Sequence, residues 1–200
     1  MAHMENRIMT RKNSGFSTKA VHAGEKWDPA TGAAITPIYE TSVFGFSSTK
    51  QLIDVMNQKA EGYVYTRYGN PTWKVAEEKV AELEAAEDGT VFSYGMAAIA
   101  TTIFTLASSG DHVVSTRDVY GGTLSLFKDV LPKFKVEVSF VEATDLGEMK
   151  SAIKKNTKVI FIETPTNPTL KIVDISKLAA IARKRGTRDS YAARKARKIC

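Results

Sequence analysis

Three short segments combine glycine or proline with side chains that can do chemistry: residues 93–96, 117–123 and 163–168. In the second segment, Tyr120 stands directly before two glycines. Its ring there can stack on a planar ligand, and its hydroxyl can pass a proton. The alternative is a tyrosine packed over a glycine turn, and the pattern alone favours neither.

Gly95 opens a segment of small residues after Ser93-Tyr94. Glycine permits a tight turn, and the free N–H groups of a first helical turn can hold a phosphate. The segment is neither a Walker loop, since no Gly-Lys-Ser/Thr follows, nor a G-x-G-x-x-G fingerprint. A purely structural turn is the alternative.

Two further polar side chains stand in suggestive places. Asn167 lies in Glu-Thr-Pro-Thr-Asn-Pro, where two prolines present it as a fixed polar group. Arg67 has the planar fork that suits bidentate phosphate contacts. An ordinary proline turn and a solvated arginine are the alternatives.

The elements that must position these segments alternate in type. β-Branched or aromatic runs occur at residues 90–93, 112–115, 136–141 and 159–163, with helical patterns at 96–108, 123–134, 146–155 and 175–185. This alternation predicts an α/β fold with a doubly wound, mainly parallel sheet. Ligands of such sheets bind beyond the carboxyl ends of the strands, where the three segments fall.

The sequence before the sheet predicts an arm and two helices. Residues 1–48 lack sustained periodicity, and a short helix from Thr49 is expected to end near Gly62. A second helix begins with Asn70 as cap and Pro71 in its first turn, with Gly89 as its stop. The predicted divisions are an N-terminal arm with a short helix (1–60), an incomplete large domain (61–186) and a basic tail (187–200).

Four motifs occur in the order Y-T-R-Y-G-N-P-T, S-Y-G-M-A-A, D-V-Y-G-G-T and E-T-P-T-N-P. Together with T-K-A-V-H-A-G at residues 18–24, they closely resemble the Cys/Met-metabolism (transsulfuration) family of pyridoxal 5'-phosphate (PLP) enzymes. The resemblance runs from about residue 17 to residue 186. It implies a PLP-dependent transferase-like large domain that is incomplete here.

The resemblance also implies roles for individual residues. Tyr65 and Arg67 match side chains that reach the cofactor phosphate of a neighbouring subunit. The backbone N–H groups of Gly95 and Met96 match those that hold the phosphate within one subunit. Homodimers or homotetramers with shared active sites are therefore expected.

The same resemblance implies that two other residues contact the cofactor ring. Tyr120 matches the tyrosine that stacks on the pyridine ring and shuttles protons, so it is the candidate catalytic residue. Asn167 matches the residue that hydrogen-bonds the ring oxygen, and Glu163 matches a supporting position. The cofactor would supply the electron sink, and the protein would supply orientation and proton transfer.

The implied reactions are γ-elimination, β-elimination or γ-replacement on sulfur-containing or O-acylated amino acids. Gly122 stands where methionine γ-lyases carry a cysteine, which favours the cystathionine synthase, cystathionine lyase and sulfhydrylase branches. Two residues depart from the family pattern: Tyr94 replaces a serine beside the phosphate, and Trp73 replaces a frequent arginine.

The family motif V-D-N-T and the S-x-T-K turn with the cofactor-binding lysine are expected after residues 175–186. Residues 187–200 contain neither, and Ser47-Ser-Thr-Lys50 matches S-x-T-K only by coincidence. We therefore expect negligible turnover from the chain as written. The change to unrelated sequence predicts a shifted reading frame after Gly186.

Charge is concentrated at the same end. Residues 183–200 hold eight Lys or Arg and one Asp, whereas the preceding residues hold 20 basic and 21 acidic residues. A solvated end and a phosphate-binding tail are the alternatives to a shifted frame. The rest of the sequence carries no nucleic-acid signature, so no nucleic-acid partner is expected.

The remaining composition is that of a globular protein, with 43% hydrophobic and 25% charged residues. A single cysteine and the lack of an apolar leader or membrane span predict a cytoplasmic location. No spacing of His, Cys or carboxylates predicts a metal site.

Two functional hypotheses remain at this point. The first is the N-terminal part of a PLP-dependent C–S lyase or γ-synthase that acts on amino acids. The second is a non-catalytic fragment that pairs with a full-length family member.

Overall fold

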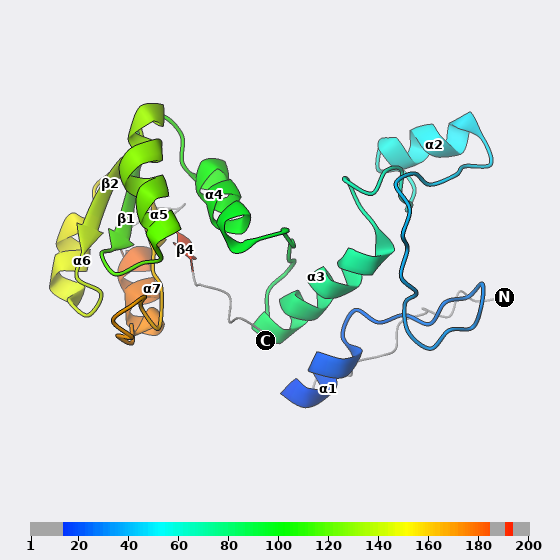
Figure 1. Ribbon diagram of the computed structural model, residues 1–200, viewed down its shortest axis with the longest axis horizontal. Coiled ribbons are helices and arrows are strands. Elements are labelled where there is room, and N and C mark those ends of the chain that lie inside the picture. Colours follow the sequence, from blue (N-terminus) through cyan, green and yellow to red (C-terminus); the bar gives the residue numbers. More distant parts are fainter. Residues whose placement is uncertain (1–13, 185–190, 194–200) are drawn as a thin grey trace. The chain divides into compact units, whose positions relative to one another are not determined.

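The computed structural model describes residues 14–184 and 191–193 (Figure 1). The chain divides into two compact units between Val91 and Phe92, named here the N-terminal unit and the C-terminal unit. The predicted domain boundaries after residues 60 and 186 stay predictions.

The C-terminal unit is built on a parallel sheet. Its strands are β1 (His112–Thr116), β2 (Glu137–Val141), β3 (Thr157–Phe161) and β4 (Tyr191–Ala193), in the order β2-β1-β3-β4. All three neighbouring pairs are parallel. The predicted mainly parallel α/β sheet is confirmed.

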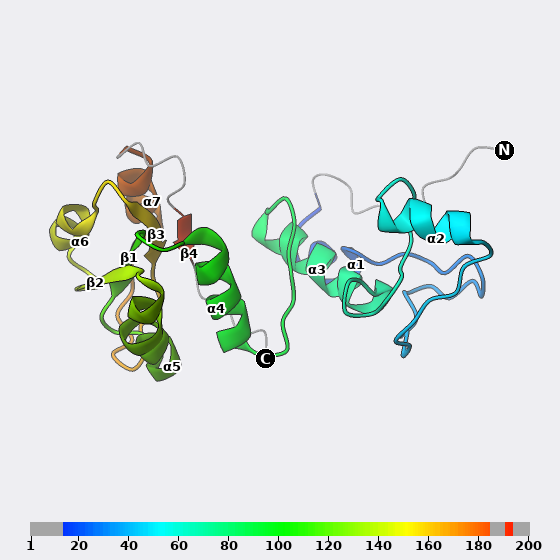
Figure 2. The ribbon, with the colours of Figure 1, turned by 90° about the horizontal axis from the view of Figure 1, so that it is seen from above.

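Each face of the sheet carries its own buried cluster. Val113 of β1 packs in one cluster with Ile103 and Phe127, and Val114 packs in the other with Met149 and Leu178. Successive side chains of a strand point to opposite faces. The sheet is therefore covered on both sides, as a doubly wound fold requires, and Figure 2 shows helices on both sides of it.

The helices of this unit follow the predicted order with shifted ends. They are α4 (Gly95–Leu106), α5 (Gly121–Ser125), α6 (Leu146–Ala152) and α7 (Ile175–Lys184). The single helix predicted over residues 123–134 is instead α5 followed by a π turn (Leu126–Val130) and a 3-10 turn (Leu131–Phe134). Pro132 lacks the N–H that a continuous α-helix needs, which explains the change of winding.

One strand prediction was wrong, and one strand was not predicted. Residues 90–93 form no strand: the amide of Val91 donates to the Glu77 side chain at 3.2 Å, and no described strand pairs with this segment. Conversely, residues 191–193 form β4 beside β3, in a tail for which no strand was predicted. Backbone pairing to an open sheet edge does not require an apolar sequence, which is why the composition missed it.

The N-terminal unit contains α1 (Phe16–His22), α2 (Thr49–Met56) and α3 (Pro71–Glu84). Asn70 caps α3 as predicted, since its side chain accepts from the amide of Thr72. The helix ends at Ala85 in the left-handed region rather than at Gly89, and α2 ends before the predicted Gly62. The helix α1 lies inside the segment expected to be an arm without periodicity.

Within the described ranges, no helix is both long and apolar enough to cross a membrane.

Candidate active site

The loops that follow β1 and β3 meet at a buried carboxylate. The amide of Tyr120, just after β1, donates to Oε2 of Glu163 at 3.0 Å. Glu163 follows β3 and is 1% exposed, so this contact fixes the two loops relative to each other. The Tyr120 side chain itself stays 49% exposed and is accessible to a ligand.

Gly122 allows the Tyr120 ring to lie beside the start of α4. A Cβ atom at Gly122 would stand 2.8 Å from Cε1 of Tyr120 and 3.2 Å from Sδ of Met96. Any larger residue would therefore displace the ring or the thioether. The hydroxyl of Thr123 contacts the same sulfur at 3.7 Å. The predicted site residues Tyr120 and Met96 are thus brought together.

The N-terminus of α4 offers two free donors. The amides of Ala97 and Ala98 both donate to the carbonyl of Tyr94, and Tyr94 caps the helix without a side-chain hydrogen bond. Within the described residues no acceptor meets the amides of Gly95 and Met96. A twelve-residue helix with such an open first turn attracts an anion through these N–H groups and its dipole.

Asn167 lies in the loop after β3, and its side chain is exposed. The neighbouring Thr166 is buried, and its amide and carbonyl bond the backbone of Lys171 and Leu170 at 3.0 and 2.9 Å. Asn167 makes no hydrogen bond in the described part of the chain. The structure therefore places it at the carboxyl edge of the sheet without joining it to Tyr120.

Tyr65 and Arg67 belong to the N-terminal unit. Residues 64–66 pair with residues 42–44 as a short antiparallel bridge. The Arg67 guanidinium lies over the Tyr65 ring, 5.1 Å from its centroid, and its Nη2 lies 3.5 Å from the Tyr65 hydroxyl. Arg67 is exposed, so its fork is available for an anion.

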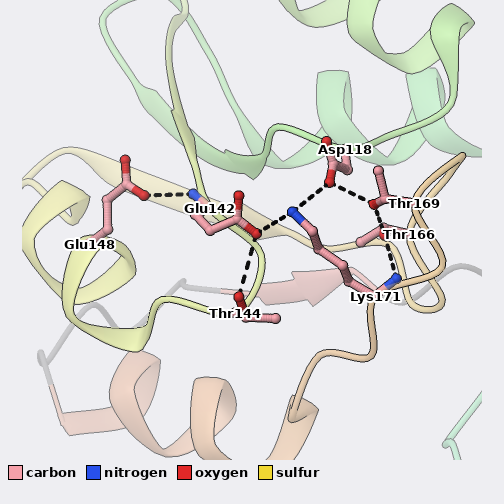
Figure 3. A network of polar contacts seen from close by, with 7 residues as sticks. All are labelled: Asp118, Glu142, Thr144, Glu148, Thr166, Thr169 and Lys171. Atoms are coloured by element: carbon pink, nitrogen blue, oxygen red, sulfur yellow. Dashed lines mark hydrogen bonds and ion pairs between the residues drawn. The ribbon is translucent and has the colours of Figure 1, made fainter.

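A polar network at the carboxyl edge was not predicted from the sequence (Figure 3). The ammonium of Lys171 bonds Glu142 at 2.7 Å and Asp118 at 3.1 Å, and Asp118 also accepts from the Thr169 hydroxyl at 2.7 Å. The Thr169 hydroxyl, followed by Lys171, lowers the pKa of Asp118, and the carboxylates of Glu142 and Asp118 raise the pKa of Lys171. The one feature of the sequence that could have indicated this network is that Asp118 and Glu142 come just after two runs predicted to be parallel strands.

No three His, Cys, Asp or Glu side chains of the described residues gather closely enough to hold a metal ion.

The sequence profile of the Cys/Met metabolism PLP-dependent enzyme family matches residues 17–189. The chain belongs to this family, which confirms the resemblance carried by the four motifs. It is 47% identical over 174 residues to an L-methionine gamma-lyase of Fusobacterium nucleatum subsp. nucleatum, a match covering 87% of this chain and 44% of that protein. It is 44% identical over 178 residues to the cystathionine beta-lyase MetC of Bacillus subtilis, covering 89% and 43%.

Solved structures agree with this fold. MetB from Corynebacterium glutamicum superposes with a TM-score of 0.81 at 39% identity, covering 91% of this chain and 45% of that one. A putative O-acetylhomoserine (thiol)-lyase from Campylobacter jejuni superposes with a TM-score of 0.80 at 34% identity, covering 86% and 42%. Its crystal structure contains N'-pyridoxyl-lysine-5'-monophosphate. The chain spans less than half the length of these relatives.

The residues present fit the phosphate and ring of PLP. The open amides of Gly95 and Met96 suit a phosphate, and the half-exposed ring of Tyr120 provides a flat aromatic surface near the Met96 side chain. Gly122 leaves room for the Tyr120 ring and the Met96 sulfur, since a Cβ atom there would stand within 3.2 Å of both. Donors for an anion and a stacking face thus occur together at one edge of the sheet.

Proposed function

We propose that this chain provides part of the active site of a PLP-dependent C–S lyase or γ-synthase that acts on sulfur-containing or O-acylated amino acids. The observation that carries the proposal is the packing of Tyr120 and Met96 across Gly122, beside the open start of α4. Family membership and this arrangement support the same ligand.

In this proposal the amides of Gly95 and Met96 bind the cofactor phosphate. Hydrogen bonds from backbone N–H groups to an ionised phosphate are short and strong, and the dipole of α4 adds to them. Tyr94, which replaces a serine, supplies no side-chain cap, so the phosphate is held here mainly by backbone donors.

Tyr120 and Asn167 are the residues that would hold the cofactor ring. Tyr120 would stack on the ring and its hydroxyl would carry a proton to or from the substrate, while the side-chain amide of Asn167 would donate to the ring oxygen. Glu163 keeps Tyr120 in place through the 3.0 Å bond to its amide. When bound, the cofactor supplies the electron sink for elimination or replacement at the substrate carbon chain.

Tyr65 and Arg67 are proposed to bind the cofactor phosphate of another copy, which makes the working protein a homodimer or homotetramer. The exposed Arg67 fork, already oriented by the Tyr65 ring, supports this role. Light scattering of the chain alone, and of a mixture with a full-length family member, tests it. Self-association supports shared sites, whereas association only with the full-length protein supports a pairing fragment that does no catalysis.

Gly122 favours the cystathionine and sulfhydrylase branches within this proposal. The relatives above include both an L-methionine gamma-lyase and a cystathionine beta-lyase at similar identity. Overall sequence identity therefore does not distinguish the branches of the family, and we propose the branch from Gly122 alone. The cytoplasmic location is likewise a proposal.

Binding of a cofactor analogue tests the proposed site. Pyridoxine 5'-phosphate lacks the aldehyde, so it cannot condense with surface lysines, and pyridoxine lacks the phosphate as well. We expect the chain to bind the phosphorylated compound at least about tenfold more tightly in equilibrium dialysis, because hydrogen bonds to a charged group contribute about 1.5–3 kcal/mol. Equal binding of both compounds, or of neither, would refute the phosphate site.

A pair of neighbouring glycines gives a matched control. Gly122→Ala would force the Tyr120 ring or the Met96 thioether to shift, so the affinity for pyridoxine 5'-phosphate should fall by about fivefold. A Cβ atom at Gly121 meets nothing within 4 Å, so Gly121→Ala should leave the affinity within about twofold. Equal effects of the two substitutions would contradict the role of Tyr120.

A further inference from the structure

Lys171 links the loops that follow three neighbouring strands. Its ammonium bonds Asp118 after β1 and Glu142 after β2, and Lys171 itself lies in the loop after β3. We propose that Lys171 is a positioning residue for the cofactor site, because it holds the loop of Tyr120 and the loop of Asn167 in a fixed relation. The inference rests on the proposed function for its meaning, but its structural part can be tested separately.

The contacts of Lys171 close a ring through Thr166, Thr169 and Asp118 (Figure 3). The Lys171 amide donates to the hydroxyl of Thr166 at 2.9 Å, which lies 2.7 Å from the hydroxyl of Thr169. Thr169 in turn donates to Asp118 at 2.7 Å. Thr166 and Thr169 flank Asn167-Pro168, so the ring anchors both ends of the short segment that presents the asparagine.

The loop of Tyr120 is anchored at two points. Asp118 bonds Lys171 and Thr169, and two residues later the amide of Tyr120 bonds the buried Glu163. Glu163 and Lys171 lie at opposite ends of the same loop after β3. The two anchors together therefore determine how far Tyr120 stands from Asn167.

The charge balance explains why the ammonium matters for geometry. The Glu142 carboxylate accepts from the Lys171 ammonium at 2.7 Å and from the neutral Thr144 hydroxyl at 3.5 Å. Without the ammonium, Asp118 and Glu142 would face each other as like charges and the loops would separate. All three side chains are 26–35% exposed, so the pairs add little to overall stability and act mainly on loop position.

Three variants of the chain separate positioning from general stability. Lys171→Met removes the charge, and Lys171→Arg keeps it. Lys154→Met is the matched control, because Lys154 pairs with Glu137 at 2.8 Å at the opposite end of the same sheet. Affinity for pyridoxine 5'-phosphate and amide hydrogen exchange over residues 117–122 and 164–171 are measured for each.

We expect Lys171→Met to weaken binding by about tenfold, at the lower end of the roughly 10- to 100-fold cost of removing residues that orient metal ligands, which act on a site in the same indirect way. In Lys171→Met, amide hydrogen exchange should accelerate in both loops. Lys171→Arg should keep most of the parent's affinity for pyridoxine 5'-phosphate, and the affinity of Lys154→Met should stay within about twofold of the parent's. Thr169→Val, which removes the Asp118 contact without a change in charge, should loosen residues 164–171 alone.

Unchanged exchange in the two loops of Lys171→Met would overturn the inference, whatever the ligand does. Equal loss of affinity in Lys154→Met would also overturn it, since a general effect of charge would then suffice. If the parent chain binds no pyridoxine 5'-phosphate, the proposed function fails, and the exchange data still decide whether Lys171 holds the loops.

Discussion

In the C-terminal unit the sheet has a buried cluster on each face, with Phe127, Ile103 and Met149 fully enclosed. In the N-terminal unit, by contrast, Ala23 and Ala81 are the only described hydrophobic residues that are buried. Large apolar side chains there stay exposed, such as Ile38 at 77% and Met56 at 66%.

The N-terminal unit relies instead on polar contacts between distant segments. Asn70 donates to the carbonyl of Tyr39 at 2.9 Å, the Tyr39 amide donates to the Thr72 hydroxyl at 2.8 Å, and Lys79 bonds Glu25 at 2.8 Å. Burial of apolar surface is the dominant source of stability in proteins. Both units expose some large apolar side chains, and Leu170 of the C-terminal unit is 73% exposed. The comparison teaches that the C-terminal unit is held together mainly by buried apolar surface, whereas the N-terminal unit buries little and depends on polar contacts.

The largest expected effect comes from the core of the C-terminal unit. Phe127→Ala removes a fully buried ring that meets Phe161 edge-on at a centroid distance of 5.1 Å, so the free energy of unfolding should fall by about 3–5 kcal/mol. Ile53→Ala in the N-terminal unit, where the side chain is 50% exposed, should cost only about 0.5 kcal/mol. Urea titrations followed by circular dichroism measure both, and similar losses would erase the contrast between the units.

Asn70→Ala should have the largest effect within the N-terminal unit. Its buried side chain caps α3 and also bonds Tyr39 and Thr66, so its loss should cost about 1–2 kcal/mol. Both tryptophans, Trp27 and Trp73, lie in this unit, so tryptophan fluorescence follows its unfolding selectively. A loss no greater than that of Ile53→Ala would show that polar contacts do not hold this unit together.

The smallest effect is a pH dependence in the C-terminal unit. His112 bonds Thr157 at 2.8 Å and Ser139 at 2.9 Å, and burial, followed by the charge of Lys154, lowers its pKa below the usual 6.5. The folded state therefore binds fewer protons than the unfolded state. The contribution of His112 to the free energy of unfolding should be fully present above pH 6.5, and it should be lost as the pH falls below that value and through the pKa of His112 in the folded state.

Unfolding by urea at pH 7.5, 6.5 and 5.5 checks this dependence, with His112→Gln as the control that should lose it. The carboxylates with lowered pKa values, such as Asp118 and Glu137, titrate in a more acidic range and do not confuse the result. Constant stability of the parent chain over this window would contradict the account of His112.

Strands and helix ends that depend on short stretches of sequence could be predicted from the sequence. The runs that became β1, β2 and β3 were placed correctly to within about two residues, and Asn70-Pro71 marked the start of α3. Residues 90–93 show the limit of this reasoning, because a β-branched run becomes a strand only where a neighbour supplies hydrogen bonds.

The site shows the same division. Tyr120 and Asn167 were selected because each follows a strand in an unusual turn, and Gly95 because it follows a run that was wrongly predicted to be a strand. Their roles at a cofactor site stay predictions. Lys171 was not found, because its contacts with Glu142 and Asp118 join segments 29 and 53 residues away in the sequence, and only folding brings them together.

Nuclear magnetic resonance of the ¹⁵N-labelled chain tests the central claim most directly, as pyridoxine 5'-phosphate is added. The amide signals of Gly95, Met96, Tyr120 and Asn167 should shift together and saturate at one concentration, and pyridoxine without phosphate should leave the first two nearly unmoved. Saturating shifts confined to other residues, or none at the start of α4, would contradict the account.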